Sequence, residues 1–349
     1  MSDSIFSKLL YIGPDINGKG GISSVLSSYS RMITPFYYMP SNSRYGTVLG
    51  ILMLIKLLVW VPYYCLVKRI KIVHIHGASG KSFVRKRLIM KWAKFWGVKT
   101  VFHCHSAEFE LYVNRMGKDK VVRTLSEYDS VVVLSQKWAT FFRKSLGLSN
   151  VVVINNIVEK VEYNNVKNID TGVVKLLFLG AIGERKGIFD LLEVIALHKN
   201  ELKNKIKILI GGNGEVDRLM NFIKKNDITS CVEYVGWVVG EKKTELLKNC
   251  DVVVLPSYNE GLPIVLLEAM AYAKPSITTN VGGIPEIVEN GVNGVVINPG
   301  DKEAIYNAMK LFIEKPQLIA EYGVEGLKRV EDYYPESVKK QLENLYNQL

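Results

Sequence analysis

Two glutamates, Glu260 and Glu268, lie eight positions apart in a stretch rich in glycine and proline, residues 251–301. Glu260 follows a short apolar run, and Pro263 suits the first turn of a helix that contains Glu268. A carboxylate accepts hydrogen bonds from vicinal hydroxyls, and the N–H groups at a helix start bind phosphate, so the pattern favours a sugar or nucleotide ligand. The alternative is structural: Glu260 complements the helix dipole and Glu268 is a solvated helix residue.

Short runs of Val, Ile and Leu predict the strands that must position these glutamates. Runs without polar alternation are typical of parallel strands covered on both faces, so we expect an α/β fold with two consecutive parallel-sheet domains and a polar linker over residues 159–172. In such sheets ligands bind beyond the carboxyl ends of the strands. The runs are residues 9–13, 71–77, 99–105, 130–135 and 150–154, then 175–180, 205–211, 231–236, 251–257, 275–280 and 294–299.

The spacing Glu, seven residues, Glu resembles the signature of the retaining GT-B glycosyltransferases called group 1, of the bacterial surface-polysaccharide type. The segments GGISSVL (20–26), LGAIGERKGIFDLLEV (179–194), GGIPEIV (282–288) and NGVVINPGD (293–301) fall in the order of that family. The resemblance implies two Rossmann-like domains that face each other across a cleft. Residues 1–168 would bind the acceptor and 169–332 the nucleotide sugar, and a helix over 333–349 would pack back on the first domain.

The resemblance also implies the roles of individual residues. The catalytic residues would be Glu260, on hydroxyls of the donor sugar, Lys186, on the diphosphate, and His105, beside the reacting sugar. Glu268 would bind the ribose of the nucleotide. The remaining donor contacts would come from Asn259, the backbone of Gly261, Leu262 and Pro263, and the first-domain loop at Gly20 and Gly21.

One position departs from the family pattern, since Ala181 stands where an arginine is usual. Arg185 is the nearest replacement, and with Lys186 it would neutralise the diphosphate leaving group. We therefore expect no cofactor and no divalent metal. His103 and His105 form an H-x-H pair, but the sequence offers no evident third metal ligand, and His74 and His76 stay unassigned.

The implied activity is transfer of a sugar from a nucleotide-sugar donor, with retention, to a lipid-linked intermediate of surface polysaccharide such as capsule, O-antigen or exopolysaccharide. Two alternatives stay open. One is a nucleotide-sugar epimerase of the same architecture, and the other is a non-catalytic partner subunit that only binds the donor.

The charge is unevenly distributed. Residues 1–170 hold 24 Lys and Arg against 10 Asp and Glu, whereas residues 171–349 hold 21 against 24. The first half therefore suits an anionic partner. No nucleic-acid motif accompanies this charge, so we expect an anionic membrane surface and a polyprenyl-diphosphate-linked acceptor instead.

Two segments of the first half bear on the membrane. Residues 47–67 are apolar apart from Lys56, and Pro62 is expected to interrupt the helix; we predict a helix that is buried or rests on a bilayer, with a true span as the alternative. Residues 77–99 predict a helix with basic residues on one side and apolar residues on the other. Four scattered cysteines and an N-terminus unlike a signal peptide indicate a cytoplasmic protein, peripherally bound at the inner membrane face.

Overall fold

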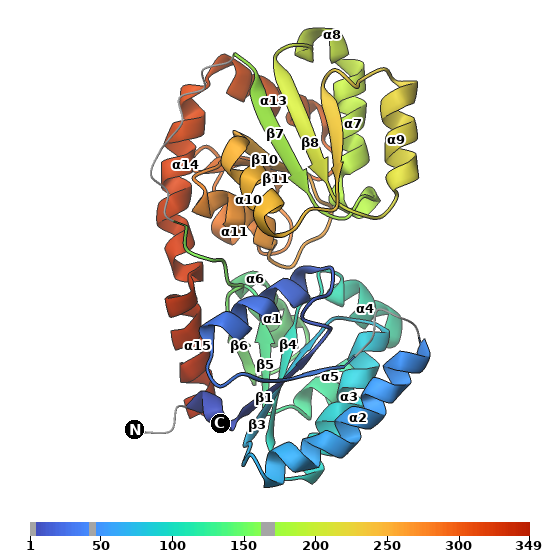
Figure 1. Ribbon diagram of the computed structural model, residues 1–349, viewed down its shortest axis with the longest axis vertical. Coiled ribbons are helices and arrows are strands. Elements are labelled where there is room, and N and C mark those ends of the chain that lie inside the picture. Colours follow the sequence, from blue (N-terminus) through green and yellow to red (C-terminus); the bar gives the residue numbers. More distant parts are fainter. Residues whose placement is uncertain (1–4, 42–46, 162–171) are drawn as a thin grey trace. The chain divides into compact units, whose positions relative to one another are not determined.

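The computed structural model describes residues 5–41, 47–161 and 172–349 and divides the chain into two compact units (Figure 1). Unit 1 comprises Met1–Ile157 and Tyr333–Leu349, and unit 2 comprises Val158–Asp332. Each unit contains one six-stranded sheet whose strands pair in parallel, so the prediction of two parallel-sheet α/β domains is confirmed. The boundary expected at residue 168, and most of the expected linker, lie outside the described residues.

The sheet of unit 1 has the strand order β2-β1-β3-β4-β5-β6. Five of its strands coincide with the predicted apolar runs. β2 was not predicted, because its sequence YYMP is short and lacks Val or Ile. The strands are β1 (Leu9–Gly13), β2 (Tyr37–Pro40), β3 (Ile72–Gly77), β4 (Lys99–Cys104), β5 (Ser130–Val133) and β6 (Val151–Val153).

Helices surround this sheet, and one of them comes from the far end of the chain. Helix α15 (Pro335–Asn347) packs on η1 (Ile5–Lys8) and on α1 (Gly21–Met32) (Figure 1). The chain therefore enters unit 2 and returns to complete unit 1. The other helices of unit 1 are α2 (Thr47–Leu66), α3 (Lys81–Phe95), α4 (Phe109–Met116), α5 (Lys118–Ser126), α6 (Gln136–Thr140) and the π-helical turn η2 (Phe141–Ser145).

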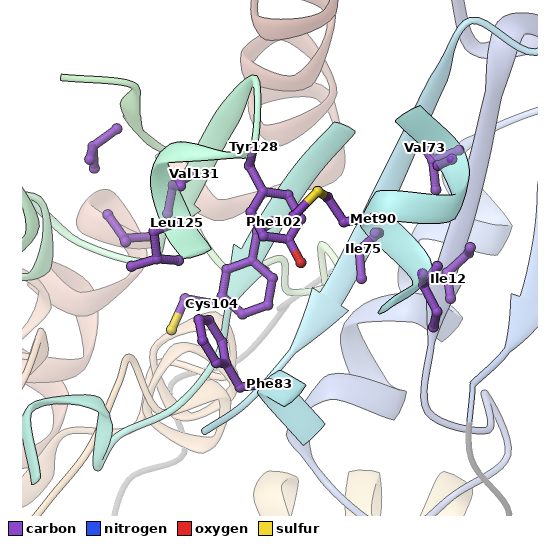
Figure 2. Packing of buried hydrophobic residues seen from close by; sticks show 14 of the residues in the cluster. Ile12, Val73, Ile75, Phe83, Met90, Phe102, Cys104, Leu125, Tyr128 and Val131 are labelled. Atoms are coloured by element: carbon purple, nitrogen blue, oxygen red, sulfur yellow. The ribbon is translucent and has the colours of Figure 1, made fainter. Parts of the chain in front are cut away.

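The core of unit 1 fills the space between the sheet and helices α2 to α6. Figure 2 shows Phe102 of β4 between Phe83 of α3 and Tyr128; the Phe83 and Phe102 rings meet edge to face with centroids 5.5 Å apart. Cys104 lies beside them, and burial raises the pKa of its thiol to about 12. The thiol thus behaves as a small hydrophobic group.

Helix α2 runs without a break from Thr47 to Leu66, so the expectation that Pro62 interrupts it is wrong. A proline removes the hydrogen bond to the carbonyl four residues earlier, which is that of Leu58. The indole of Trp92 on α3 donates to this carbonyl at 2.9 Å and takes the place of the missing N–H. Within the described residues no helix is both long and apolar enough to cross a membrane.

Helix α3 does not divide into the basic and apolar sides that its sequence suggested. Lys86 is buried, with 1% of its surface exposed, and contacts the hydroxyl of Ser41. Three apolar side chains of the same helix, Val84, Leu88 and Phe95, are exposed instead. The two-sided prediction is wrong because α3 is covered by β3, β4 and α2, and so buries side chains over a wide part of its circumference.

The sheet of unit 2 has the strand order β12-β11-β10-β7-β8-β9. All six strands coincide with predicted runs. β7 comes first in the chain and has β10 on one side and β8 on the other, which is the order of a Rossmann sheet. The strands are β7 (Val174–Leu179), β8 (Ile206–Gly211), β9 (Val232–Gly236), β10 (Val252–Leu255), β11 (Ser276–Thr279) and β12 (Gly294–Ile297).

The helices of unit 2 link consecutive strands and extend past the last one. Helix α11 begins one residue later than predicted, with Pro263 in the preceding cap position. The helical segments are η3 (Glu184–Lys186), α7 (Ile188–Leu197), α8 (Lys199–Leu202), α9 (Val216–Lys225), α10 (Gly240–Asn249), α11 (Ile264–Ala271), α12 (Ile284–Ile287), α13 (Lys302–Glu314), α14 (Gln317–Arg329) and η4 (Val330–Tyr333).

Candidate active site

The strand order of unit 2 reverses between β7 and β10, and the loops that leave these two strands carry the predicted residues. Arg185 and Lys186 lie in η3, in the loop after β7. Asn259, Glu260 and the segment 261–263 lie in the loop after β10. In open α/β sheets the ligand crevice forms at such a reversal, beyond the carboxyl ends of the strands. The structure thus brings these predicted residues to the position where a ligand is expected.

The two loops are joined by hydrogen bonds. Nη1 of Arg185 donates to the carbonyl of Asn259 at 2.9 Å, and the N–H of Tyr258 donates to the carbonyl of Arg185 at 2.9 Å. Gly187 allows this close approach: its φ is +67°, and a Cβ there would lie 2.0 Å from the carbonyl oxygen of Pro256. At least one N–H of Arg185 therefore holds the loop of Glu260 in place.

Glu260 is a buried carboxylate with two partners. Its Oε1 accepts a hydrogen bond of 2.7 Å from the hydroxyl of Ser257 and contacts Nζ of Lys186. The side chains of Lys186 and Glu260 are 14% and 6% exposed, so water screens this ion pair little. The arrangement holds a positive and a negative group side by side beyond the carboxyl ends of β7 and β10.

The glycine pair after β11 supports the same loop from behind. Gly282 has a φ of +55°, and a Cβ at this position would lie 1.9 Å from the carbonyl oxygen of Glu260. The N–H of Gly283 donates to the carbonyl of Gly261 at 2.7 Å. The backbone at 260–261 is thereby fixed by a segment that the sequence presented only as a family motif.

Glu268 lies on α11 and is paired with a lysine from α10. Nζ of Lys243 lies 2.5 Å from Oε1 of Glu268, and the two side chains are 27% and 18% exposed. The other carboxylate oxygen, Oε2, is buried and has no partner in the described structure. A buried acceptor without a donor is costly, so this oxygen is a ready site for a hydroxyl group of a ligand.

Unit 1 holds the remaining predicted residues. Gly20, with a φ of +141°, caps α1, and Gly21 is the first residue of that helix. His105 follows β4 and is partly exposed. Its Nε2 lies 2.9 Å from Nδ1 of His76. The structure thus places Gly20, Gly21 and His105 beyond the carboxyl ends of β1 and β4.

His105 is the outermost of four histidines on one face of this sheet. Residues two apart in a strand share a face, so β3 presents His74 and His76 there, and β4 presents His103. The register pairs His76 with His103. The rings stack, with centroids 4.6 Å apart for His74 and His76 and 4.2 Å apart for His103 and His105. The four residues are called the histidine cluster below.

Two tyrosines extend the histidine cluster. The hydroxyl of Tyr346 on α15 lies 2.6 Å from Nδ1 of His74 and 3.2 Å from the hydroxyl of Tyr11. Nε2 of His74 lies 3.2 Å from Nδ1 of His103. Burial lowers the pKa of His74 and of His105 to about 3, so both rings are neutral at pH 7.

The sequence offered no third ligand beside the H-x-H pair of β4, and that expectation is wrong. His74, His76 and His103 each offer a ring nitrogen, and these atoms lie within 4.8 Å of one another. The reason is the register of the parallel strands β3 and β4, which sets His103 opposite His76 while His74 lies two residues earlier on the same face. Nε2 of His76 and of His103 are buried without a hydrogen-bond partner in the described structure, which leaves two nitrogens open to a donor or a cation.

Three residues of these sites were not identified from the sequence. Ser257 and Lys243 contact the two glutamates, and Tyr346 contacts His74. Ser257 could have been suspected from its place at the end of the β10 run, three residues before Glu260. Lys243 and Tyr346 carry no local signal, since their partners are 25 and 272 residues away in the chain.

Residues 159–329 match the family model described as glycosyl transferases group 1. This span covers all but a few residues of unit 2, so the similarity to that family lies in this unit. The matched region contains Glu260, Glu268, Lys186 and the glycine pair Gly282 and Gly283.

Relatives extend the similarity. The amylovoran biosynthesis glycosyltransferase AmsD of Erwinia amylovora is 26% identical over 362 residues, covering 97% of this chain and 99% of AmsD. The uncharacterized glycosyltransferase MJ1607 of Methanocaldococcus jannaschii is 30% identical over 191 residues, which are 54% of this chain; the chain covers 48% of MJ1607, about half its length.

Solved structures give the fold class. HepE of Anabaena, crystallised with UDP, superposes with a TM-score of 0.75 at 16% identity and covers 98% of this chain and 100% of its own. Sucrose-phosphate synthase of Thermosynechococcus elongatus gives a TM-score of 0.77 at 17% identity, with 98% of each chain covered. The predicted GT-B fold is thereby confirmed.

Proposed function

We propose that the protein is a retaining glycosyltransferase that moves a sugar from a nucleotide-sugar donor to a lipid-linked intermediate of a surface polysaccharide. The observation that carries the proposal is the ion pair of Lys186 with the buried Glu260 at the strand-order reversal of unit 2. The presence of UDP in the HepE crystals and the name of AmsD support a nucleotide-sugar donor and a polysaccharide product.

Lys186 is the group that assists departure of the diphosphate. As the glycosidic bond breaks, negative charge grows on the leaving phosphate, and a fixed cation stabilises that charge in a poorly solvated site. Lys186 is held by Glu260 on one side and has an ammonium with three donors, so it can keep one partner while it binds a phosphate oxygen. With this cation in place, transfer proceeds without a divalent metal.

The two glutamates orient the donor. Glu260 accepts hydrogen bonds from hydroxyls of the sugar, and Glu268 accepts from the ribose through the oxygen that is unpartnered in the described structure. The backbone of Gly261, Leu262 and Pro263 binds the diphosphate. Asn259 and Arg185 support this backbone from the loops after β10 and β7. One N–H of Arg185 donates to the carbonyl of Asn259 and so positions the loop, and the guanidinium has further N–H donors for the diphosphate.

Unit 1 binds the acceptor. His105 faces the reacting sugar as a neutral imidazole, and the loop at Gly20 and Gly21 lets backbone approach the phosphates. Retention follows from front-face attack, in which the acceptor hydroxyl passes its proton to the leaving phosphate.

Unit 1 also docks on the inner face of the cell membrane. Helix α2 exposes a row of large apolar side chains, and lysines and arginines dominate the charge of residues 1–170. Apolar and basic groups on one unit suit an anionic bilayer surface. The exposed large apolar side chains among the described residues of α2 are Leu52, Ile55, Leu58, Val59, Trp60, Tyr63 and Leu66.

Turnover assays test the catalytic proposal. The protein is incubated with UDP-glucose and related nucleotide sugars, first with water as acceptor and then with an extract of lipid-linked saccharides. We expect release of the nucleoside diphosphate and a lengthened saccharide, and we expect E260Q to abolish both. Isomerised donor without transfer would establish the epimerase alternative, and donor binding without turnover in the wild type would establish the non-catalytic partner.

Vesicle flotation tests the membrane proposal. We expect the protein to float with phosphatidylglycerol vesicles and not with phosphatidylcholine vesicles, and to detach as salt is raised because salt screens the attraction. Equal flotation with both lipids would contradict docking on an anionic surface.

A further inference from the structure

Helices α2, α3 and α4 of unit 1 line a pocket of about 600 Å³ that the catalytic proposal does not use. This volume lies within the range of small-molecule sites in proteins. Most of its walls are apolar, yet Val84, Leu88 and Leu111 keep 53%, 53% and 55% of their surfaces exposed, so the pocket is open to solvent. Its apolar walls are formed by Leu54, Val84, Leu88, Leu111, Tyr112 and Met116.

Three cations stand among these apolar walls. Lys81 and Arg85 come from the first turns of α3, and Arg115 comes from the end of α4. Nε of Arg85 is buried without a hydrogen-bond partner in the described structure. Glu108 is the one carboxylate that lines the same pocket. The pocket therefore has a positive balance.

Three other basic residues of α3 have a carboxylate partner, and the buried Lys86 contacts the hydroxyl of Ser41. Arg87 and Lys91 pair with Glu127, and Lys94 pairs with Asp129. Over the described ranges, 5–41, 47–161 and 172–349, no carboxylate lies within ion-pair distance of Lys81, Arg85 or Arg115. Apart from the buried Lys86, the basic residues of α3 that have no carboxylate partner in the described structure thus line the pocket.

Apolar walls and unpaired cations together select an amphiphile. A free sugar or nucleotide would leave its hydroxyl groups unbonded against Val84, Leu88 and Leu111, at a cost for each group. A hydrocarbon chain has no such groups, and a phosphate bound to the chain offers acceptors to the arginines. The pocket's volume suits a single hydrocarbon chain, whereas the exposed apolar side chains of α2 suit a flat bilayer surface.

We propose that this pocket binds the diphosphate end of a polyprenyl diphosphate. The isoprene units nearest the diphosphate lie between α3 and α4, and the phosphates contact Lys81, Arg85 and Arg115. The inference deepens the proposed function and rests on it for the identity of the lipid. It assigns to unit 1 a specific acceptor site beside a general membrane surface.

Binding of radiolabelled geranylgeranyl diphosphate to the full-length protein, measured by equilibrium dialysis in detergent-free buffer, tests the proposal. We expect saturable binding by the wild type. V84W fills the pocket and R115E reverses a cation, and each is expected to weaken binding at least tenfold. The matched controls, V59W on the exposed side of α2 and K118E on α5, lie outside the pocket and are expected to bind within twofold of the wild type.

Two comparisons decide what a negative result means. Geranylgeraniol, which lacks phosphates, is expected to bind at least tenfold more weakly than the diphosphate. Flotation of V84W on phosphatidylglycerol vesicles is expected to match the wild type, because the bilayer does not enter the pocket. Wild-type-like binding of the diphosphate by both V84W and R115E, or no saturable binding by the wild type, would overturn the proposal.

The donor side is measured separately so that the two proposals can fail independently. Release of nucleoside diphosphate from a nucleotide sugar in water needs no lipid, and V84W and R115E are expected to keep the wild-type rate. A wild type that binds the prenyl diphosphate but neither binds nor hydrolyses a nucleotide sugar would contradict the proposed function and still support the lipid site.

Discussion

Trp92 on α3 donates its indole N–H to the carbonyl of Leu58 on α2, at 2.9 Å, and Leu58 is the residue whose helical partner Pro62 removes. The bond therefore does two things. It satisfies the carbonyl that the proline leaves open, and it ties α2, with its exposed apolar side chains, to α3.

A double-mutant cycle tests this link. W92F alone is expected to lower the free energy of unfolding by about 1–2 kcal/mol, because the Leu58 carbonyl loses its donor. P62A restores a backbone N–H to that carbonyl, so the cost of W92F in the P62A background should fall by about 1 kcal/mol. Urea unfolding of the four proteins measures both numbers. An equal cost of W92F in the two backgrounds would show that the indole N–H contributes nothing at this position.

Lys186 is expected to matter more for turnover than for the fold. K186M keeps much of the side-chain volume and removes the charge, and we expect kcat to fall by about 100-fold or more because the leaving diphosphate loses its cation. K224M on the exposed surface of α9 is the matched control and should retain wild-type kcat. Initial rates of nucleoside diphosphate release give the comparison. A K186M enzyme with unchanged donor affinity and turnover would remove Lys186 from the site.

The histidine cluster, in which His74, His76 and His103 are buried, predicts loss of stability in mild acid. The pKa values of His74 and His105 are lowered to about 3 in the folded protein, against about 6.5 for an unfolded histidine. Below pH 6.5 the unfolded chain gains protons that the folded chain does not, so stability is present above pH 6.5 and falls as the pH drops toward 3.

The expected slope is about 1.4 kcal/mol per pH unit for each histidine that stays neutral when folded. Urea unfolding between pH 7 and pH 5 isolates this effect, since unfolded carboxyl groups titrate mainly below that interval, with pKa values of about 4. A free energy of unfolding that is constant from pH 7 to pH 5 would mean that the folded histidines take up protons as readily as the unfolded ones.

Tyr346 is expected to stabilise unit 1 through its hydroxyl. Y346F removes the group 2.6 Å from Nδ1 of His74 and also the partner of Tyr11, and both are buried. We expect a loss of about 1–3 kcal/mol in the free energy of unfolding, since buried polar groups are left unpaired. Y306F, which removes an exposed bond to Glu201, is the control and should cost about 1 kcal/mol or less. Equal costs for the two variants would contradict a structural role of the buried hydroxyl.

Local patterns in the sequence were enough to predict most of the sheet but not its side-chain pairs. Runs such as VVVL in β10 are apolar at every position, so their burial can be inferred from the run itself. The strand YYMP has no such run and was missed. Glu260 could be proposed as a site residue from its spacing to Glu268. Its contact with Lys186, 74 residues away in sequence, depends on β7 lying next to β10.

The burial of Lys86 and the third histidine ligand were missed for a related reason. Each depends on what another strand or helix places opposite the residue, and a single periodicity carries no such information. Lys86 is covered because α3 has neighbours on several sides, and His103 meets His74 and His76 because of the strand register.

The return of α15 to unit 1 also has a consequence for synthesis of the protein. The first unit begins at the N-terminus, but Tyr346, which contacts His74 and Tyr11, is translated only after the whole of unit 2. Domains usually fold in order as they leave the ribosome. Here unit 1 cannot complete its fold until α15 has been synthesised, because His74 and Tyr11 lack the Tyr346 hydroxyl until then. Unit 2 can therefore complete its fold on the ribosome before unit 1 does.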